Sequence, residues 1–208
     1  MAEKKQYPRV LVPITDGTED IEAVTVIDIL RRTQEVDLVV ATVGKNQITA
    51  ARQTKIVGDK SIDDVLSENI FFVMLPRGPG ASKLYESKEL KKLLDAQVDN
   101  GGLLAAICAA PAVVLAQHGF LKNVECTCYP SDKFSEIMRK NDAKLLEKER
   151  VVVRRTGGSD GKRTVVITSQ GPATALDFSL TIVEVLWGKD KAGEIAKATL
   201  HPWKPIVV

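Results

Sequence analysis

The sequence is poor in the residues that build metal centres and disulfide frameworks. Its 208 residues include three cysteines and two histidines. Neither His118 nor His201 lies in a ligand or triad pattern, and Cys126 and Cys128 have no partner at zinc-ligand spacing. We therefore expect no metal site. Three thiols in a chain of this length indicate a reducing compartment rather than disulfide bridges.

A strong charge of one sign and long apolar runs are also missing. Lys and Arg total 29 against 27 Asp and Glu, a formal net charge of +2, which gives no electrostatic case for nucleic acid or an anionic membrane as a partner. The longest apolar stretch, Leu103–Ala116, is interrupted by Pro111 and is shorter than the roughly 20 residues that span a bilayer. The first six residues carry no apolar signal-peptide core, and we expect a cytoplasmic protein.

What the sequence does contain is the composition of an ordinary folded domain. Hydrophobic residues make up 44% and charged residues 27%, close to globular averages. Short β-rich runs alternate with amphipathic stretches, a pattern typical of a parallel sheet covered by helices. Because a chain of this length fits one large domain better than two, we expect a single α/β domain over residues 1–208.

The hydrophobic pattern also predicts the individual elements. Strands are expected at 10–14, 36–43, 55–57 (near an edge), 70–75 and 103–107, and helices at 19–32, 87–100, 109–117 and 173–187. Residues 151–154 and 164–168 flank the turn-rich segment Thr156–Gly161 and predict an antiparallel hairpin. The apolar side of the first helix is expected to consist of Ile21, Val24, Ile27 and Leu30.

The most informative stretch is Leu103–Leu115, in which an apolar strand is followed at Cys108 by a helix with Pro111 near its first turn. A thiol at the beginning of a helix faces the partial positive charge of free amides, which lowers its pKa from about 8.5 toward roughly 3.5–7.5. Small neighbours such as Ala109 leave room for a tight turn and an exposed sulfur, as in the nucleophile elbow of hydrolases. The alternative is a buried structural cysteine.

Two further segments follow predicted strands at the same edge of the sheet. Pro76–Gly80 offers glycines that permit close backbone approach and present amides to an oxyanion, or it is an ordinary turn. Glu22 lies at the beginning of the first helix and borders its inward face. A partly buried carboxyl group there would have a raised pKa and would donate a hydrogen bond to a nearby sulfur. Ligands of open α/β sheets bind at this edge.

Four motifs together resemble the ThiJ/PfpI superfamily, in the branch of the parkinsonism-associated protein deglycase DJ-one. The motifs are Gly17–Glu22, Leu75–Gly78, Ala105–Pro111 and Thr168–Thr174. The resemblance runs from Val10 to about Ala198. It implies a flavodoxin-like α/β sandwich of three layers with a mostly parallel sheet and an added antiparallel hairpin. It also implies a homodimer, with the first helix and Arg31–Arg32 at the dimer contact.

The resemblance assigns roles to five residues. Cys108 matches the reactive cysteine and Glu22 its protonated acidic partner. Gly78 and Ala109 match the positions whose amides form the oxyanion hole. Arg52 matches an arginine that approaches the site from the partner subunit.

Three positions depart from the family pattern. Tyr129 stands where animal members carry a histidine before proline, and its reference pKa of about 10 excludes a base near neutral pH. Ala109 follows Cys108, where peptidase-like and chaperone-like branches have histidine, which argues against a Cys-His peptidase. Arg77 replaces the first glycine of a Gly-Gly pair. Tyr129 and Arg77 are possible cleft-lining residues, and Arg77 would favour an anionic substrate or simply point outward.

The resemblance implies a cofactor-free enzyme that acts on methylglyoxal-type dicarbonyls, a glutathione-independent glyoxalase, or on their early adducts with Lys, Arg or Cys, a deglycase. Such an enzyme would protect against carbonyl and oxidative stress. The alternative is a redox-sensing stress protein or chaperone, in which Cys108 is oxidised to the sulfinate with little turnover. Thiazole or nucleotide metabolism is a weaker interpretation, because no phosphate-binding loop is present.

Overall fold

The computed structural model describes residues 7–76, 78–157 and 163–206. Its central feature is a seven-stranded sheet in the order β10-β11-β7-β6-β1-β2-β5. The strands are β1 (Arg9–Ile14), β2 (Asp37–Thr42), β5 (Lys60–Ser61), β6 (Phe72–Leu75), β7 (Leu103–Ile107), β10 (Val151–Gly157) and β11 (Arg163–Ser169). Every pairing in this sheet is parallel except that of β10 with β11. The expected parallel sheet with an added antiparallel hairpin is confirmed, while most of the predicted turn between β10 and β11 lies outside the described residues.

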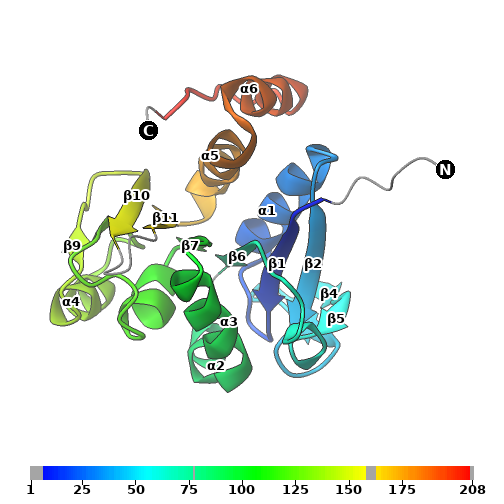
Figure 1. Ribbon diagram of the computed structural model, residues 1–208. Helices are drawn as coiled ribbons and strands as arrows, with labels where there is room; N and C mark the ends of the chain where they lie inside the picture. The colour runs from blue at the N-terminus through cyan, green and yellow to red at the C-terminus, as the bar shows by residue number, and fades with distance from the viewer. Residues whose placement is uncertain (1–6, 77, 158–162, 207–208) are drawn as a thin grey trace.

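Helices cover both faces of this sheet and give the expected three layers (Figure 1). One face is covered by α1 (Asp20–Arg32), α5 (Ala175–Trp187) and α6 (Lys189–Ala198). The other face is covered by α2 (Ala81–Glu86), α3 (Lys88–Asp99), α4 (Asp132–Lys140) and η2 (Pro111–Ala116), a short helix with π-helical winding. None of the described helices is both long and apolar enough to cross a membrane.

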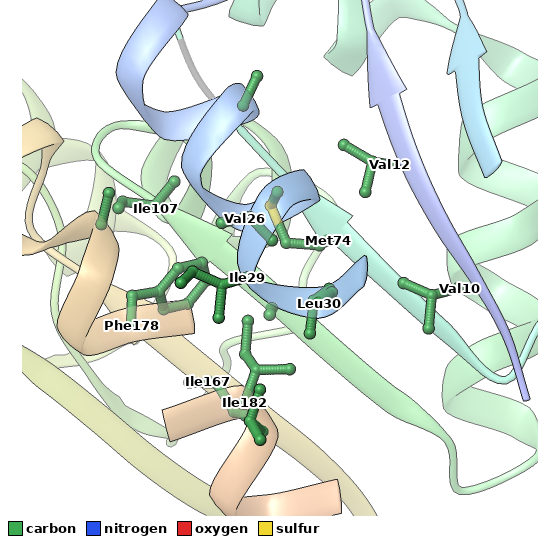
Figure 2. Packing of buried hydrophobic residues seen from close by; sticks show 14 of the residues in the cluster. Val10, Val12, Val26, Ile29, Leu30, Met74, Ile107, Ile167, Phe178 and Ile182 are labelled. Atoms are coloured by element: carbon green, nitrogen blue, oxygen red, sulfur yellow. The ribbon is translucent and has the colours of Figure 1, made fainter. Parts of the chain in front are cut away.

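Each face has its own apolar core. In the first cluster, side chains of α1 and α5 pack against alternate residues of the strands, as Figure 2 shows for Val26, Ile29, Phe178 and Met74. The second cluster lies beneath α3, η2 and α4. The two clusters follow from the alternation of side chains along a strand, which sends neighbouring residues to opposite faces.

Small elements stand beside the main sheet. They are the pair β3 (Gln47–Thr49) and β4 (Lys55–Val57), the pair β8 (Glu125–Cys126) and β9 (Lys144–Leu145), and the single turns η1 (Asp63–Val65) and η3 (Pro172–Thr174). The strand expected at 55–57 therefore exists as β4, but it pairs with β3 and not with an edge of the main sheet. Helices α2, α4 and α6 were not expected from the sequence.

The apolar side predicted for the first helix is confirmed for Leu30 and for the partly buried Ile27, but it is wrong for Ile21 and Val24. Ile21 and Val24 are 54% and 49% exposed, while Glu22, Val26 and Ile29 are buried. A helix turns about 100° per residue, so a stripe spaced strictly by three drifts by about 60° at each step around the axis. The inward face of α1 follows the mixed spacing of three and four, and Glu22 is part of it.

Candidate active site

The carboxyl ends of three neighbouring parallel strands meet at the middle of the sheet. The chain leaves β1 toward α1, β6 toward Gly78, and β7 toward Cys108. Because β6 lies between β1 and β7, the three segments that follow these strands are neighbours although they are far apart in the sequence. Ligands of open α/β sheets bind at such an edge.

Cys108 follows β7 directly and has a left-handed backbone, with φ of +66°. A residue with a Cβ atom rarely adopts this conformation, and the strain it carries is characteristic of functional sites. Two hydrogen bonds hold the residue in place, because its amide donates to the Ser169 carbonyl at 2.9 Å and its carbonyl accepts from the Tyr129 amide at 2.6 Å. The structure thus has the tight strand-to-helix turn that the sequence predicted.

The expected exposure of the sulfur is wrong. Cys108 is 3% exposed and belongs to the apolar cluster beneath α1 and α5. The backbone at Tyr129 lies directly against Cys108 through the hydrogen bond described above. A thiol in this position is reached by small molecules far more readily than by large ones.

Glu22 is fully buried in the first turn of α1. The helix begins there because the Glu19 side chain caps it, accepting a hydrogen bond from the Glu22 amide at 2.8 Å. Ala23, the next residue, packs in the same cluster as Cys108. The Glu22 side chain is therefore shielded from solvent at the edge of the sheet where Cys108 lies.

Glycines let the loops after β1 and β6 touch backbone to backbone. A Cβ atom on Gly78 would collide with the Gly17 carbonyl oxygen and lie 2.6 Å from the Glu19 nitrogen. The Gly80 amide donates to the same Gly17 carbonyl at 3.3 Å. Gly78 is therefore fixed against the beginning of α1, and no larger residue fits there without displacing one loop.

Two backbone amides at this edge are available to a ligand. The backbone hydrogen bonds among the described residues include none donated by the amide of Gly78 or of Ala109. Ala109 is fully buried next to Cys108. Free amides next to a nucleophile are the arrangement that stabilises an oxyanion.

Arg52 is exposed at the turn between β3 and β4. Two carboxylates at the beginning of α1 hold this turn: Asp20 accepts from the Arg52 amide at 2.8 Å, and Asp16 accepts from the Thr49 amide at 2.9 Å. Desolvation raises the pKa of Asp20, but hydrogen bonds from Thr54 and the Arg52 amide outweigh it and leave the pKa below its ordinary value. The turn therefore lies beside the loop that carries Glu22.

The two possible cleft-lining residues, Tyr129 and Arg77, have different outcomes. Tyr129 is 43% exposed, and its ring packs edge-on against Phe134. A Cβ atom on Gly171 would lie 3.4 Å from the Tyr129 ring, so this ring stands over the loop that follows β11. Arg77 lies outside the described residues.

The other two cysteines lie in a different environment. Cys126 and Cys128 are buried in the second cluster, on the opposite face from Cys108. Burial, together with the nearby Cys128 sulfur for Cys126 and Glu147 for Cys128, raises the pKa of each thiol to about 12. Neither is available as a thiolate near neutral pH.

The histidines are engaged elsewhere. His118 stacks on Tyr85 with ring centroids 4.5 Å apart, and burial lowers its pKa. His201 places Nε2 2.8 Å from Asp177 Oδ1. Within residues 7–76, 78–157 and 163–206, no three His, Cys, Asp or Glu side chains are grouped so that they could hold a metal ion.

One supporting group was missed by the sequence analysis. The Ser169 hydroxyl donates to the Arg150 carbonyl at 2.8 Å and lies 2.6 Å from the Thr174 hydroxyl. The Ser169 carbonyl in turn accepts from the Cys108 amide. The motif Thr168–Thr174 had marked the segment, but no spacing rule connects it with a cysteine about sixty residues earlier in the sequence.

Similar known proteins identify the family of this chain. The model of the DJ-1/PfpI family matches residues 8–185. Protein DJ-1 homolog B of Arabidopsis thaliana is 37% identical over 93% of this chain, and this chain covers 41% of that protein and 46% of DJ-1 homolog A of the same plant. The chain thus spans less than half the length of these two relatives.

Other relatives match along nearly their whole length. The glutathione-independent glyoxalase DJR-1.2 of Caenorhabditis elegans is 35% identical over 90% of this chain and 92% of its own. The solved structure of oxidized Toxoplasma gondii DJ-1 has 34% sequence identity and a TM-score of 0.82, covering 94% of this chain and 99% of its own. A family match over most of the chain, joined to these similarities, shows that the chain belongs to the DJ-1/PfpI family.

Proposed function

We propose that this protein is a cysteine-dependent, cofactor-free glyoxalase that converts methylglyoxal-type dicarbonyls to hydroxy acids and so protects against carbonyl stress. The observation that carries the proposal is the left-handed Cys108 at the end of β7, beside free amides of Gly78 and Ala109. The activity named for the Caenorhabditis elegans relative supports it.

The reaction is an internal redox conversion that needs no external oxidant. The Cys108 sulfur adds to the aldehyde carbon, and the carbonyl electrons move to the oxygen, where the amides of Gly78 and Ala109 stabilise the charge. Glu22 then moves the proton of the former aldehyde carbon to the neighbouring ketone carbon, which leaves a thioester of the hydroxy acid. Water cleaves the thioester, releases the acid and restores the thiol.

The burial of Cys108 favours free dicarbonyls over glycated proteins. Because Cys108 is only 3% exposed, a molecule of methylglyoxal size would need a smaller opening to reach it than an adduct on a folded protein's lysine or arginine. The deglycase activity is therefore the secondary form of the proposal. Its test must use purified adducts from which free methylglyoxal has been removed, because removing the free compound reverses early adducts by mass action.

The test is the formation of lactate from methylglyoxal by the wild type, Cys108→Ser and Glu22→Gln, with Cys128→Ser as the matched cysteine control. We expect lactate from the wild type and from Cys128→Ser, and a loss of about a hundredfold or more in Cys108→Ser and Glu22→Gln. A wild type that makes no lactate above the buffer blank, or a Cys108→Ser variant that keeps full turnover, refutes the proposal.

A second function is supported by the distribution of the thiols. Because Cys126 and Cys128 lie on the other face of the sheet, a sulfenic acid on Cys108 has neither of them beside it to form a disulfide. Oxidation then continues to the sulfinic acid, and Glu22 can donate a hydrogen bond to the sulfinate. One solved relative was described in an oxidized form. This protein would be a redox sensor or a chaperone with little turnover.

Peroxide titration followed by intact-mass and peptide analysis tests the sensor function. We expect Cys108 to gain two oxygen atoms at a few molar equivalents of peroxide, and Glu22→Gln to need a larger excess. Oxidation that is distributed evenly over the three cysteines would exclude it. Methylglyoxal turnover then decides which of the two functions is the main one.

We also propose that the protein is a homodimer in which α1 faces a second copy. Ile21 and Val24 are neighbours on the surface of this helix, and each exposes about half of its surface. Two adjacent exposed apolar side chains indicate a contact surface for a partner. Arg52 stands beside the beginning of the same helix and would reach the partner's site. Sedimentation of the wild type and of Val24→Asp provides the test, with a dimer expected for the first and a monomer for the second. A monomeric wild type excludes the proposal.

A further inference from the structure

A cavity of about 440 Å³ lies between the beginning of β10, α5 and the C-terminal segment, residues 201–206. This volume is in the range of small-molecule binding sites. None of the described residues proposed for the Cys108 site lines it. The cavity is therefore a separate place on the molecule, and the proposed glyoxalase chemistry does not use it.

The C-terminal segment is a fixed wall of this cavity. At one end, His201 Nε2 lies 2.8 Å from Asp177 Oδ1. At the other end, the Ile206 amide donates to Oε2 of the buried Glu184 at 2.9 Å. Between these two anchors, the half-buried Trp203 packs against the first apolar cluster and lines the cavity. Because the wall is already held in place, a ligand would not have to order it.

Three cationic side chains line the cavity, and they come from two segments that are far apart in the sequence. They are Lys148 and Arg150 before β10 and Lys204 in the C-terminal segment, all exposed. Arg150 is fixed, because it donates to Asp177 Oδ2 at 2.7 Å and to the Ala173 carbonyl at 3.0 Å. Neither lysine forms an ion pair within the described part of the chain. Both ammonium groups are therefore available to a ligand.

The remaining lining residues decide the chemistry of that ligand. Two carboxylates line the cavity, Asp177 and the exposed Glu149. Asp177 already interacts with both Arg150 and His201, so its charge is compensated and the cations leave a positive surplus that attracts anions. The indole of Trp203 supplies an aromatic surface beside these cations, and such a surface favours a planar ring.

We propose that this cavity is a second binding site, which takes a small planar organic anion. The ring of the ligand stacks on Trp203, and its carboxylate or phosphate group pairs with Lys148 and Lys204. The site does not depend on the proposed glyoxalase function, so either proposal can fail without the other.

Fluorescence can report on this site directly. Trp187 and Trp203 are the two tryptophans of the chain, so Trp187→Phe leaves Trp203 as the only indole fluorophore. The probes are benzoate, which carries a carboxylate on a ring, and adenosine monophosphate, which carries a phosphate. Benzyl alcohol and adenosine are their uncharged counterparts. Calorimetric titration of the wild type measures the same affinities without any substitution.

We expect at least one of the two anions to bind with a Kd of about 1 mM or below, and its uncharged counterpart to bind about tenfold more weakly or not at all. The anion that binds identifies the charged group. Lys148→Ala/Lys204→Ala and Trp203→Leu should each weaken binding about tenfold. The control is Lys45→Ala/Lys88→Ala, which removes the same charge from two exposed lysines that do not line the cavity, and it should leave the Kd unchanged.

Three results would overturn the proposal. The first is that neither anion binds to the wild type at about 10 mM. The second is that the uncharged counterparts bind as tightly as the anions. The third is that Lys148→Ala/Lys204→Ala affects binding no more than Lys45→Ala/Lys88→Ala does.

Discussion

All three cysteines are buried, but the surroundings of Cys108 differ from those of Cys126 and Cys128. Cys108 follows a central strand in a left-handed conformation, next to the Ala109 amide, for which the described residues offer no backbone acceptor. Cys126 and Cys128 pack in the second core, where burial raises the pKa of both thiols to about 12. Burial alone therefore does not distinguish the cysteine that we propose to be reactive from the other two. The backbone conformation and the neighbouring amide do.

The largest expected effect is on alkylation of Cys126 and Cys128. Raising a thiol pKa from 9.0 to about 12 lowers the thiolate fraction near neutral pH about a thousandfold. Iodoacetamide should modify these two residues about a thousand times more slowly in the native protein than in urea, while the rate at Cys108 falls far less. Peptide mass spectrometry of timed samples measures the three rates. Equal native rates at the three cysteines would contradict the comparison.

The second prediction concerns Gly78, whose amide we propose as part of the oxyanion hole. In Gly78→Ala the new methyl group would collide with the Gly17 carbonyl, so the loop must move and its amide leaves the site. We expect turnover to fall about a hundredfold and the melting temperature to fall, with Cys128 as unreactive as before. Gly193→Ala is the control, because a methyl group there meets no atom within 4 Å. It should raise the stability by about 0.5–1 kcal/mol and leave turnover intact.

The third prediction is a loss of stability in alkali. The unfolded chain ionises its thiols above about pH 9, whereas Cys126 and Cys128 remain protonated in the fold until about pH 12. The unfolded state then binds fewer protons, so stability falls as the pH rises, by about 2 kcal/mol for each thiol at pH 10.5. Urea unfolding of the wild type and of Cys126→Ala/Cys128→Ala between pH 8 and 10.5 measures the difference. Parallel curves for the two proteins would show that the thiols do not contribute.

The smallest effect is expected from Ser169→Ala. This change removes the hydrogen bonds to the Arg150 carbonyl and the Thr174 hydroxyl but keeps the carbonyl that holds the Cys108 amide. We expect a loss of about 1–2 kcal/mol in unfolding free energy and a change of a few-fold in the alkylation rate of Cys108. The rates at Cys126 and Cys128 should not change. A large change at those residues would mean that the two faces are coupled.

The sequence correctly predicted the elements whose local pattern is sufficient to define them. The strand before Cys108 and the tight turn at this residue followed from an apolar run that ends in small side chains. The resemblance supplied Arg52, which no local pattern indicates. What was missed depends on contacts between distant residues. The turn that carries Arg52 is held by Asp16 and Asp20, and the outward position of Ile21 depends on the face of α1 that meets α5.

The burial of the Cys108 sulfur also could not be predicted from the sequence. A strand-to-helix turn can be open or covered, and the cover here comes from the segment at Tyr129, about twenty residues later.

The contact between the loops after β1 and β6 has a consequence for how this protein can change over generations. Because Gly17, Gly78 and Gly80 touch across the two loops, an insertion or a larger residue in one loop would require a compensating change in the other. The two loops are therefore expected to change together in evolution, although about sixty residues separate them in the sequence. Variation that alters substrate choice is expected instead at positions such as Tyr129, whose partly exposed ring can be exchanged without displacing a backbone.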